Sequence, residues 1–123
     1  MNSEPATDCD SPLDHAAALR RAEGDVELLA DMARIFLADC PRLIANIRAA
    51  VANGTPREIE HAAHELKGCL GSFVAHRGFA AAQKLEILGR AGSLADARVA
   101  AAAVEAEVQR LTPAMERLIT PAE

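Results

Sequence analysis

Apolar residues recur every three or four positions along most of this chain. The clearest stretch lies near the C-terminus, where seven of them follow one another at spacings of 4, 3, 4, 3, 4 and 3: Ala97, Ala101, Val104, Val108, Leu111, Met115 and Leu118. This period matches one face of an α-helix and is typical of the seam of a helix bundle. No alternating run of β-branched residues competes with it, so we expect an all-α fold.

Capping residues and glycines divide the periodic pattern into segments. Residues suited to cap a helix N-terminus occur at Ser11, Asp25, Thr55 and Ser93. Thr55-Pro56-Arg57-Glu58 has the form of a capping box, with proline at the first helical position. The predicted helices end near Gly24, near Gly54, near Ala75, between 89 and 92, and near 118. The stretch His76-Arg77-Gly78 interrupts the pattern, so the fourth helix is expected to begin at Phe79.

The 123 residues are enough for one domain with a real core. Four long helices joined by short loops predict an antiparallel four-helix bundle, with an additional short helix at the N-terminus. This single domain is expected over 11–120, after a flexible, polar N-terminal tail over 1–10. Pro41 lies inside the second predicted helix, where we expect a kink with the helix continuing beyond it, and Pro113 lies inside the last predicted helix, which it is expected to bend or end early.

The charge balance of the chain points to a protein partner. Eighteen acidic residues against thirteen basic ones give a net charge of −5, which disfavours binding to nucleic acid or to an anionic membrane surface. Three Phe and no Trp or Tyr leave few rings on which bases could stack. We therefore expect neither nucleic acid nor membrane as a partner.

Cysteine usage and hydropathy predict a cytoplasmic protein. Cys9, Cys40 and Cys69 are widely spaced and form no CxxC pair, which fits a reducing compartment. No stretch approaches the roughly 20 apolar residues needed to span a bilayer, and the N-terminus lacks the pattern of a signal peptide. A bundle of this length can close its own core without a second apolar face, so we expect a monomer.

The predicted third helix separates an apolar face from a polar face that is centred on His64. The apolar face comprises Ile59, Ala62, Ala63, Leu66, Leu70, Phe73 and Val74. The side chains within about 60° of His64 on a helical wheel are charged or small: Arg57, Glu60, His61, Lys67, Gly68, Gly71 and Ala75. Each glycine in an exposed helix costs about 1 kcal/mol relative to alanine. Gly68 and Gly71 therefore indicate a surface that another protein approaches closely.

An exposed imidazole beside a lysine suits phosphoryl transfer. Near pH 7 an ordinary imidazole is largely neutral and hence nucleophilic, and Lys67 is placed to neutralise charge on phosphoryl oxygens. The chain has no Walker-type or other glycine-rich nucleotide loop, so the phosphoryl group must come from another molecule.

The spacing Glu58-x-x-His61 also occurs in di-iron bundles, but no second such motif accompanies it. We therefore expect no metal site.

The run Ala63-His64-Glu65-Leu66-Lys67-Gly68, followed by Gly71, Leu85-Glu86 and Gly89-Arg90, resembles the signature of bacterial histidine-containing phosphotransfer (HPt) domains. The similarity extends over about 12–118 and includes Ala18-Leu19, Gly24-Asp25 and the run from Phe36 to Pro41. It implies a four-helix bundle in which His64 is phosphorylated and Lys67 steadies the phosphate. It also implies that Gly68 and Gly71 admit a receiver domain and that Glu86 contacts the site. Val74, where many members have glycine, departs from the pattern at the end of the third helix.

These observations predict a phosphocarrier of a two-component phosphorelay. His64 would accept a phosphoryl group from a receiver aspartate, supplied by a hybrid sensor histidine kinase, and pass it to the aspartate of another receiver. We expect no nucleotide site and no cofactor, with Mg²⁺ carried by the receiver. The residues expected to meet the partner are Gly68, Gly71, Arg57, His61, Ala75 and Glu86. The alternative is a receiver-binding module of the same fold that performs no chemistry.

Overall fold

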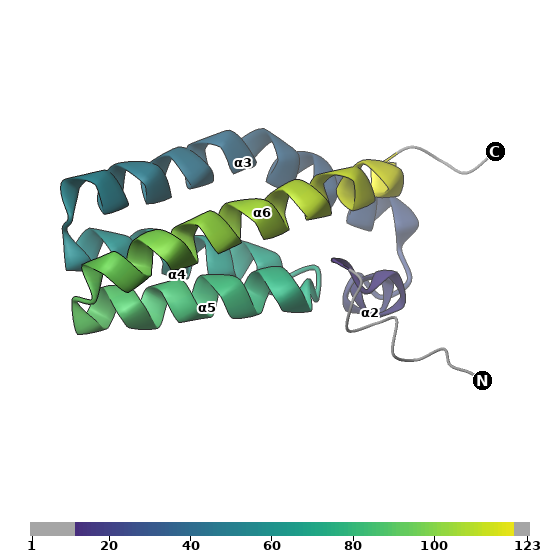
Figure 1. Ribbon diagram of the computed structural model, residues 1–123. Helices are drawn as coiled ribbons and strands as arrows, with labels where there is room; N and C mark the ends of the chain where they lie inside the picture. The colour runs from purple at the N-terminus through teal and green to yellow at the C-terminus, as the bar shows by residue number, and fades with distance from the viewer. Residues whose placement is uncertain (1–11, 120–123) are drawn as a thin grey trace.

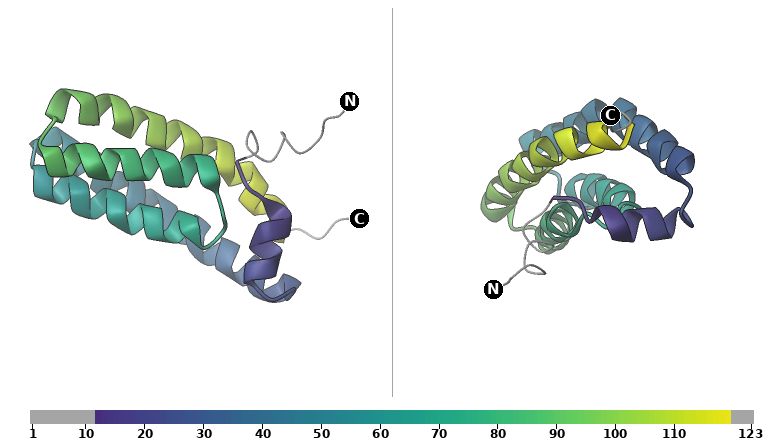
Figure 2. Two further views of the ribbon diagram at one scale, coloured as in Figure 1. Left: turned by 90° about the horizontal axis from the view of Figure 1, so that it is seen from below. Right: turned by 90° about the vertical axis from the view of Figure 1, so that its right-hand side faces the viewer.

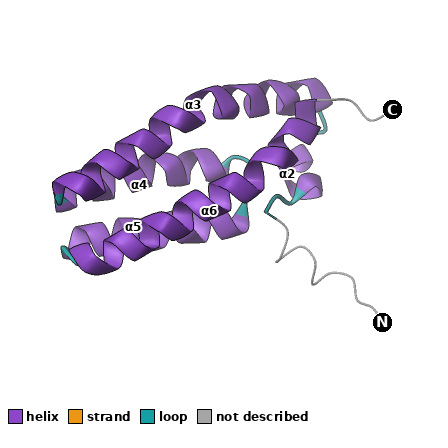
Figure 3. Ribbon diagram, turned by 45° about the horizontal axis from the view of Figure 1, so that its top comes forward, coloured by secondary structure: helices purple, strands orange, loops and turns teal. Residues whose placement is uncertain are grey.

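The computed structural model describes residues 12–119, and the regular structure within them is entirely helical. The helices are α2 (His15–Arg21), α3 (Val26–Asn53), α4 (Pro56–Gly71), α5 (His76–Ala91) and α6 (Leu94–Ile119), as Figure 1 shows. Short loops join them (Figure 3). This confirms the expected all-α fold, whereas the expected N-terminal tail and the Ser11 cap lie outside the described residues.

The four long helices form an antiparallel bundle. Helices α4 and α6 each pack against both α3 and α5, so the four lie around one shared core. Helix α2 lies across one end of the bundle, where it contacts α3 (Figure 2). Leu13, just before α2, is buried together with Ala18 and Ala22, so this segment covers that end of the core. The expected bundle with a short additional N-terminal helix is therefore confirmed.

Local chemistry explains where most of these helices begin. The Asp25 carboxylate accepts a hydrogen bond from the Leu28 backbone N–H at 3.0 Å, which caps α3 as expected. Thr55 precedes α4, and Pro56 is its first helical residue, but the Thr55 side chain makes no capping hydrogen bond. The expected start of the short helix is wrong by about three residues. Asp14 caps α2 by accepting from the Ala17 N–H at 3.0 Å, so Pro12 precedes the helix.

The junction between α4 and α5 also differs from the expectation. Helix α4 ends at Gly71 rather than near Ala75, and His76-Arg77-Gly78 form the first turn of α5 rather than a break. The Ala75 N–H donates to the Leu70 carbonyl at 3.3 Å, and Val74 has a left-handed φ of 53°. These features define a Schellman-type helix end with valine at the position that glycine usually occupies. A β-branched residue gives no sequence signal for such a turn.

The buried faces of the long helices follow the periodic pattern with some shifts. All seven expected seam residues of α6 are buried, and neither Pro41 nor Pro113 ends its helix. On α3, the apolar residues at helical spacing include Phe36, Leu43 and Ile47, which are buried, but also Leu28 and Ile35, which are exposed. The small residues Ala33 and Ala50 complete the buried face of α3.

Candidate functional site

His64 lies on the solvent side of α4, as the helical wheel predicts. Its side chain is 66% exposed. On the opposite face of the helix, five of the seven expected residues are buried in the bundle core: Ile59, Ala62, Ala63, Leu66 and Leu70. A sixth, Phe73, is buried just after the end of α4. The seventh, Val74, is half-buried in the loop that follows α4. The core packing of α4 therefore fixes the direction in which the imidazole points.

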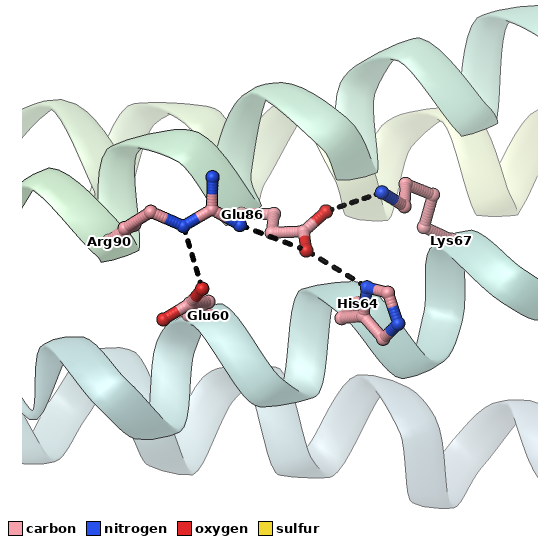
Figure 4. A network of polar contacts seen from close by, with 5 residues as sticks. All are labelled: Glu60, His64, Lys67, Glu86 and Arg90. Atoms are coloured by element: carbon pink, nitrogen blue, oxygen red, sulfur yellow. Dashed lines mark hydrogen bonds and ion pairs between the residues drawn. The ribbon is translucent and has the colours of Figure 1, made fainter.

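Glu86 of α5 lies beneath His64 and orients its ring. The Glu86 side chain is only 7% exposed, and its Oε2 lies 2.9 Å from His64 Nδ1 (Figure 4). Lys67 Nζ lies 2.7 Å from the other carboxylate oxygen, Oε1. The hydrogen bond from Lys67 is the main cause that lowers the pKa of Glu86, assisted by the bond from His64, although burial acts in the opposite direction.

This hydrogen bond selects one tautomer of the His64 ring. With its pKa lowered, Glu86 is a carboxylate at neutral pH and can only accept hydrogen bonds. In the neutral ring, Nδ1 of His64 must then carry the proton, which leaves the lone pair on Nε2. Nε2 has no hydrogen-bond partner among residues 12–119. The ring therefore offers an unprotonated nitrogen to the solvent.

Lys67 is more tightly held than a solvated surface lysine. Its side chain is 20% exposed and is fixed by Glu86 at one side. Its Nζ also lies 5.8 Å from the centroid of the Phe79 ring of α5, a distance typical of a cation–π contact. The ammonium group of Lys67 is thus held one helical turn from His64, in the position that the sequence predicts for a cation beside a phosphoryl group on Nε2.

Arg90 and Glu60 extend the network on the other side of Glu86. Arg90 Nε donates to Glu60 Oε2 at 2.7 Å, and Arg90 Nη2 lies 3.5 Å from Glu86 Oε2 (Figure 4). Sequence reasoning placed Glu60 on the His64 side of α4 but assigned no role to either residue. The spacing of Glu86, Gly89 and Arg90 at i, i+3 and i+4 puts all three on one face of α5, and this signal could have identified Arg90.

The two predicted glycines of α4 have different surroundings. A Cβ added to Gly68 would have no neighbour within 4 Å, so the surface beside His64 is open at this point. A Cβ added to Gly71 would lie 3.5 Å from Cε2 of Phe79, so this glycine faces α5. Gly68 thus has the open surroundings that a close approach requires. The role of Gly71 in partner binding stays a prediction.

The other predicted contact residues fall into two groups. Arg57 and His61 are exposed and line an open hollow of about 380 Å³ together with His64 and three residues of the polar network: Glu60, Glu86 and Arg90. Ala75 is fully buried, because it follows the turn after α4 and caps the start of α5. Its expected place on the solvent face of α4 is therefore wrong.

Gly89 appeared in the sequence analysis as a helix end and as part of the HPt-like run, but no role in the site was assigned to it. An added Cβ there would lie 2.8 Å from Cγ2 of Ile59 and 2.9 Å from the backbone nitrogen of Glu60. Real Cβ atoms are not found at such distances, so only glycine permits this approach of α5 to α4. The close approach brings Glu86 and Arg90 within reach of the His64 face.

Comparison with known protein families identifies the family to which this chain belongs. The model of the Hpt domain family matches residues 31–114, which is more than half of the chain. The chain belongs to the Hpt domain family. This Hpt domain is accordingly a phosphotransfer module of two-component signalling. No curated protein and no solved structure matches it.

None of the helices in 12–119 has both the length and the apolarity that crossing a membrane requires. Within the same residues, no group of three or more His, Cys, Asp and Glu side chains could hold a metal ion.

Proposed function

We propose that this Hpt domain is a phosphocarrier that accepts a phosphoryl group on Nε2 of His64 from a receiver aspartate and passes it to a second receiver. The observation that carries the proposal is the Nδ1–Glu86 contact of 2.9 Å beneath a ring that is 66% exposed. It leaves Nε2 as an accessible nucleophile in a fixed orientation, and phosphoryl transfer depends chiefly on such positioning.

The transfer step balances without a cofactor bound to this chain. Nε2 attacks the phosphorus of the aspartyl phosphate, an N–P bond forms, and the O–P bond breaks to release the aspartate carboxylate. The proton on Nδ1 stays in place, and the positive charge that develops on the ring is met by the Glu86 carboxylate. The reverse step loads the second receiver. Mg²⁺ is expected to be held by the receiver.

Lys67 and Gly68 have separate roles in this proposal. Lys67, held one turn from the imidazole, neutralises charge on the phosphoryl oxygens. Gly68 keeps the neighbouring surface bare, so that the receiver can bring its aspartate in line with Nε2. Arg57 and His61 line the hollow beside His64 and contribute cationic or polar contacts to the docked receiver. A hybrid sensor histidine kinase is the proposed source of the phosphoryl group, through its own receiver.

Phosphotransfer from a receiver charged with acetyl phosphate tests the function. The wild-type protein should acquire phosphate that is labile in acid and stable in base, and His64→Ala should acquire none. His15→Ala is the matched control, because it removes an exposed histidine of α2, outside the α4–α5 site, and should still accept phosphate. Receiver binding without any transfer to the wild type would favour a non-catalytic interaction module instead.

A further inference from the structure

We propose that Arg90 is a positioning residue for His64 that acts through Glu86, and that Glu60 holds Arg90 in place for this role. The proposal rests on the proposed function, because it concerns what happens to Glu86 when Lys67 turns toward a phosphoryl group. Figure 4 shows the arrangement: Lys67 and Arg90 reach the Glu86 carboxylate from opposite sides, with His64 between them.

Glu86 divides its partners between its two oxygens. Oε1 has Lys67 Nζ at 2.7 Å, whereas Oε2 has His64 Nδ1 at 2.9 Å and Arg90 Nη2 at 3.5 Å. A carboxylate that is only 7% exposed depends on such partners, because an uncompensated buried charge is strongly unfavourable. In the unphosphorylated protein, two cations share this compensation.

Phosphorylation changes that balance. If Lys67 neutralises the phosphoryl oxygens, the Oε1 atom of Glu86 loses its cation while the phosphohistidine ring still needs a hydrogen-bond acceptor at Nδ1. Arg90 is then the cation left beside Glu86, and it keeps the carboxylate ionised and in place. Arg90 itself does not serve the phosphoryl group, because Nε2 of His64 faces away from the Arg90 side of the network (Figure 4).

Glu60 and Gly89 fix the position of Arg90. The Arg90 side chain is 60% exposed, and a free arginine of that exposure would sample many rotamers. Its Nε donates to Glu60 Oε2 at 2.7 Å, which turns Nη2 toward Glu86. The absence of a side chain at Gly89 lets the backbone of Glu60 approach α5 at this level. The Glu60–Arg90 ion pair therefore links α4 to α5 and holds Arg90 beside Glu86.

The first test needs no receiver. The ¹⁵N chemical shifts of the His64 imidazole report the fraction of the ring that carries its proton on Nδ1. Arg90→Gln alone should lower this fraction only slightly, because Lys67 still supports Glu86. In a Lys67→Ala background, which imitates the loss of Lys67 to the phosphoryl group, Arg90→Gln should lower it clearly, and Arg90→Lys should restore part of it. An unchanged fraction in the double variant would overturn the proposal.

The second test measures transfer from a charged receiver. Arg90→Gln should reduce the transfer rate constant by about threefold to tenfold, the range expected for one lost hydrogen bond, with little change in the half-saturating receiver concentration. Glu60→Gln should act in the same direction and less strongly. Arg48→Gln is the matched control, because it removes a comparable ion pair between α3 and α6, with Nη2 2.6 Å from Glu105 Oε1.

The two tests separate failure of this proposal from failure of the proposed function. A wild-type protein that accepts no phosphate would refute the phosphocarrier, whereas the tautomer measurement would still decide the role of Arg90. Equal losses in Arg90→Gln and Arg48→Gln would show that only general stability is affected and would overturn the positioning role.

Discussion

The buried carboxylate of Glu86 contacts His64, Lys67 and Arg90, and these contacts make the stability of the protein fall as the pH is lowered. Its pKa is lowered in the folded state, mainly by the hydrogen bond from Lys67 and further by that from His64. A carboxyl group of this kind stabilises the fold above its ordinary pKa, for which 4.5 is the reference value, and that stabilisation is lost as the pH falls through the lower folded value.

Glu86→Gln should therefore flatten the acid limb of the stability curve. The unfolding free energy of the wild type should fall more steeply than that of Glu86→Gln as the pH is lowered from 6 to about 3, as urea titrations at each pH would measure. Glu105, whose pKa is lowered by Arg48, adds its own share. Glu105→Gln is thus the control for acid sensitivity outside the site. Parallel curves for the wild type and Glu86→Gln would contradict the inferred contacts of Glu86.

The backbone conformation of Val74 leads to a second prediction about stability. An L-residue with a side chain costs about 1–2 kcal/mol in the left-handed conformation, which Val74 adopts with a φ of 53°. Val74→Gly and Val74→Ala both remove the half-buried side-chain methyl groups, but only glycine relieves the strained backbone. Val74→Gly should be more stable than Val74→Ala by about 1 kcal/mol in chemical denaturation. Equal stabilities would show that this turn is not strained.

At the scale of the helices, the sequence predicted what depends on local pattern. The seam of α6, the apolar face of α4 and the cap of α3 at Asp25 all follow from spacing and capping chemistry, and the structure has them. His64 and Gly68 were placed on the exposed side of α4 for the same reason. These features need no knowledge of which helix packs against which.

What the sequence did not predict depends on contacts between helices or on unusual backbone conformations. The left-handed turn at Val74 has no glycine to mark it, so the end of α4 was placed too late and Ala75 was assigned to the wrong face. The approach of Gly89 to Glu60 depends on how α4 and α5 pack, as does the pairing of Arg90. Such contacts join residues about thirty positions apart, which a helical wheel cannot relate.

Gly89 makes the packing of α5 against α4 open to a direct test. Alanine at this position raises helix propensity by up to about 1 kcal/mol, but its Cβ would lie 2.9 Å from the Glu60 backbone nitrogen, which cannot move aside alone. Overpacking of this kind costs about 1–3 kcal/mol, so Gly89→Ala should be less stable than the wild type in thermal or urea unfolding. It should also slow phosphotransfer, because the helices must separate and Glu86 then moves away from His64.

Gly68→Ala is the matched control for Gly89→Ala. Its added Cβ would meet no atom within 4 Å, so the same change should raise stability by up to about 1 kcal/mol through helix propensity. The two substitutions are therefore expected to shift the unfolding midpoint in opposite directions. A stabilising effect at Gly89 would show that α4 and α5 can move apart without penalty.

At the scale of the whole molecule, the Hpt match and the bundle do not cover the same residues. The family match begins at residue 31, within α3, and ends at 114, within α6. The segment from Pro12 to Arg21 lies outside it, yet it covers one end of the bundle core with buried side chains. The site of His64, Glu86 and Lys67 is built entirely by α4 and α5, which the match includes. The N-terminal helix therefore contributes to the stability of the bundle rather than to the chemistry of the site.

Removal of residues 1–24 tests this division of roles. The shortened chain keeps Asp25, which caps α3, but loses the buried side chains of Leu13, Ala18 and Ala22. At about 1.5–3 kcal/mol for a buried leucine and less for each alanine, the unfolding free energy should fall by roughly 2–4 kcal/mol, as urea unfolding followed by circular dichroism would measure. A variant that lacks only residues 1–11 shows how much of any loss of unfolding free energy is due to the residues before Pro12.

The protein without residues 1–24 should still unfold cooperatively and keep the Nδ1–H tautomer of His64, because neither Glu86 nor the packing of α4 against α5 depends on α2. Loss of that tautomer together with a cooperative transition would mean that α2 also orders the site.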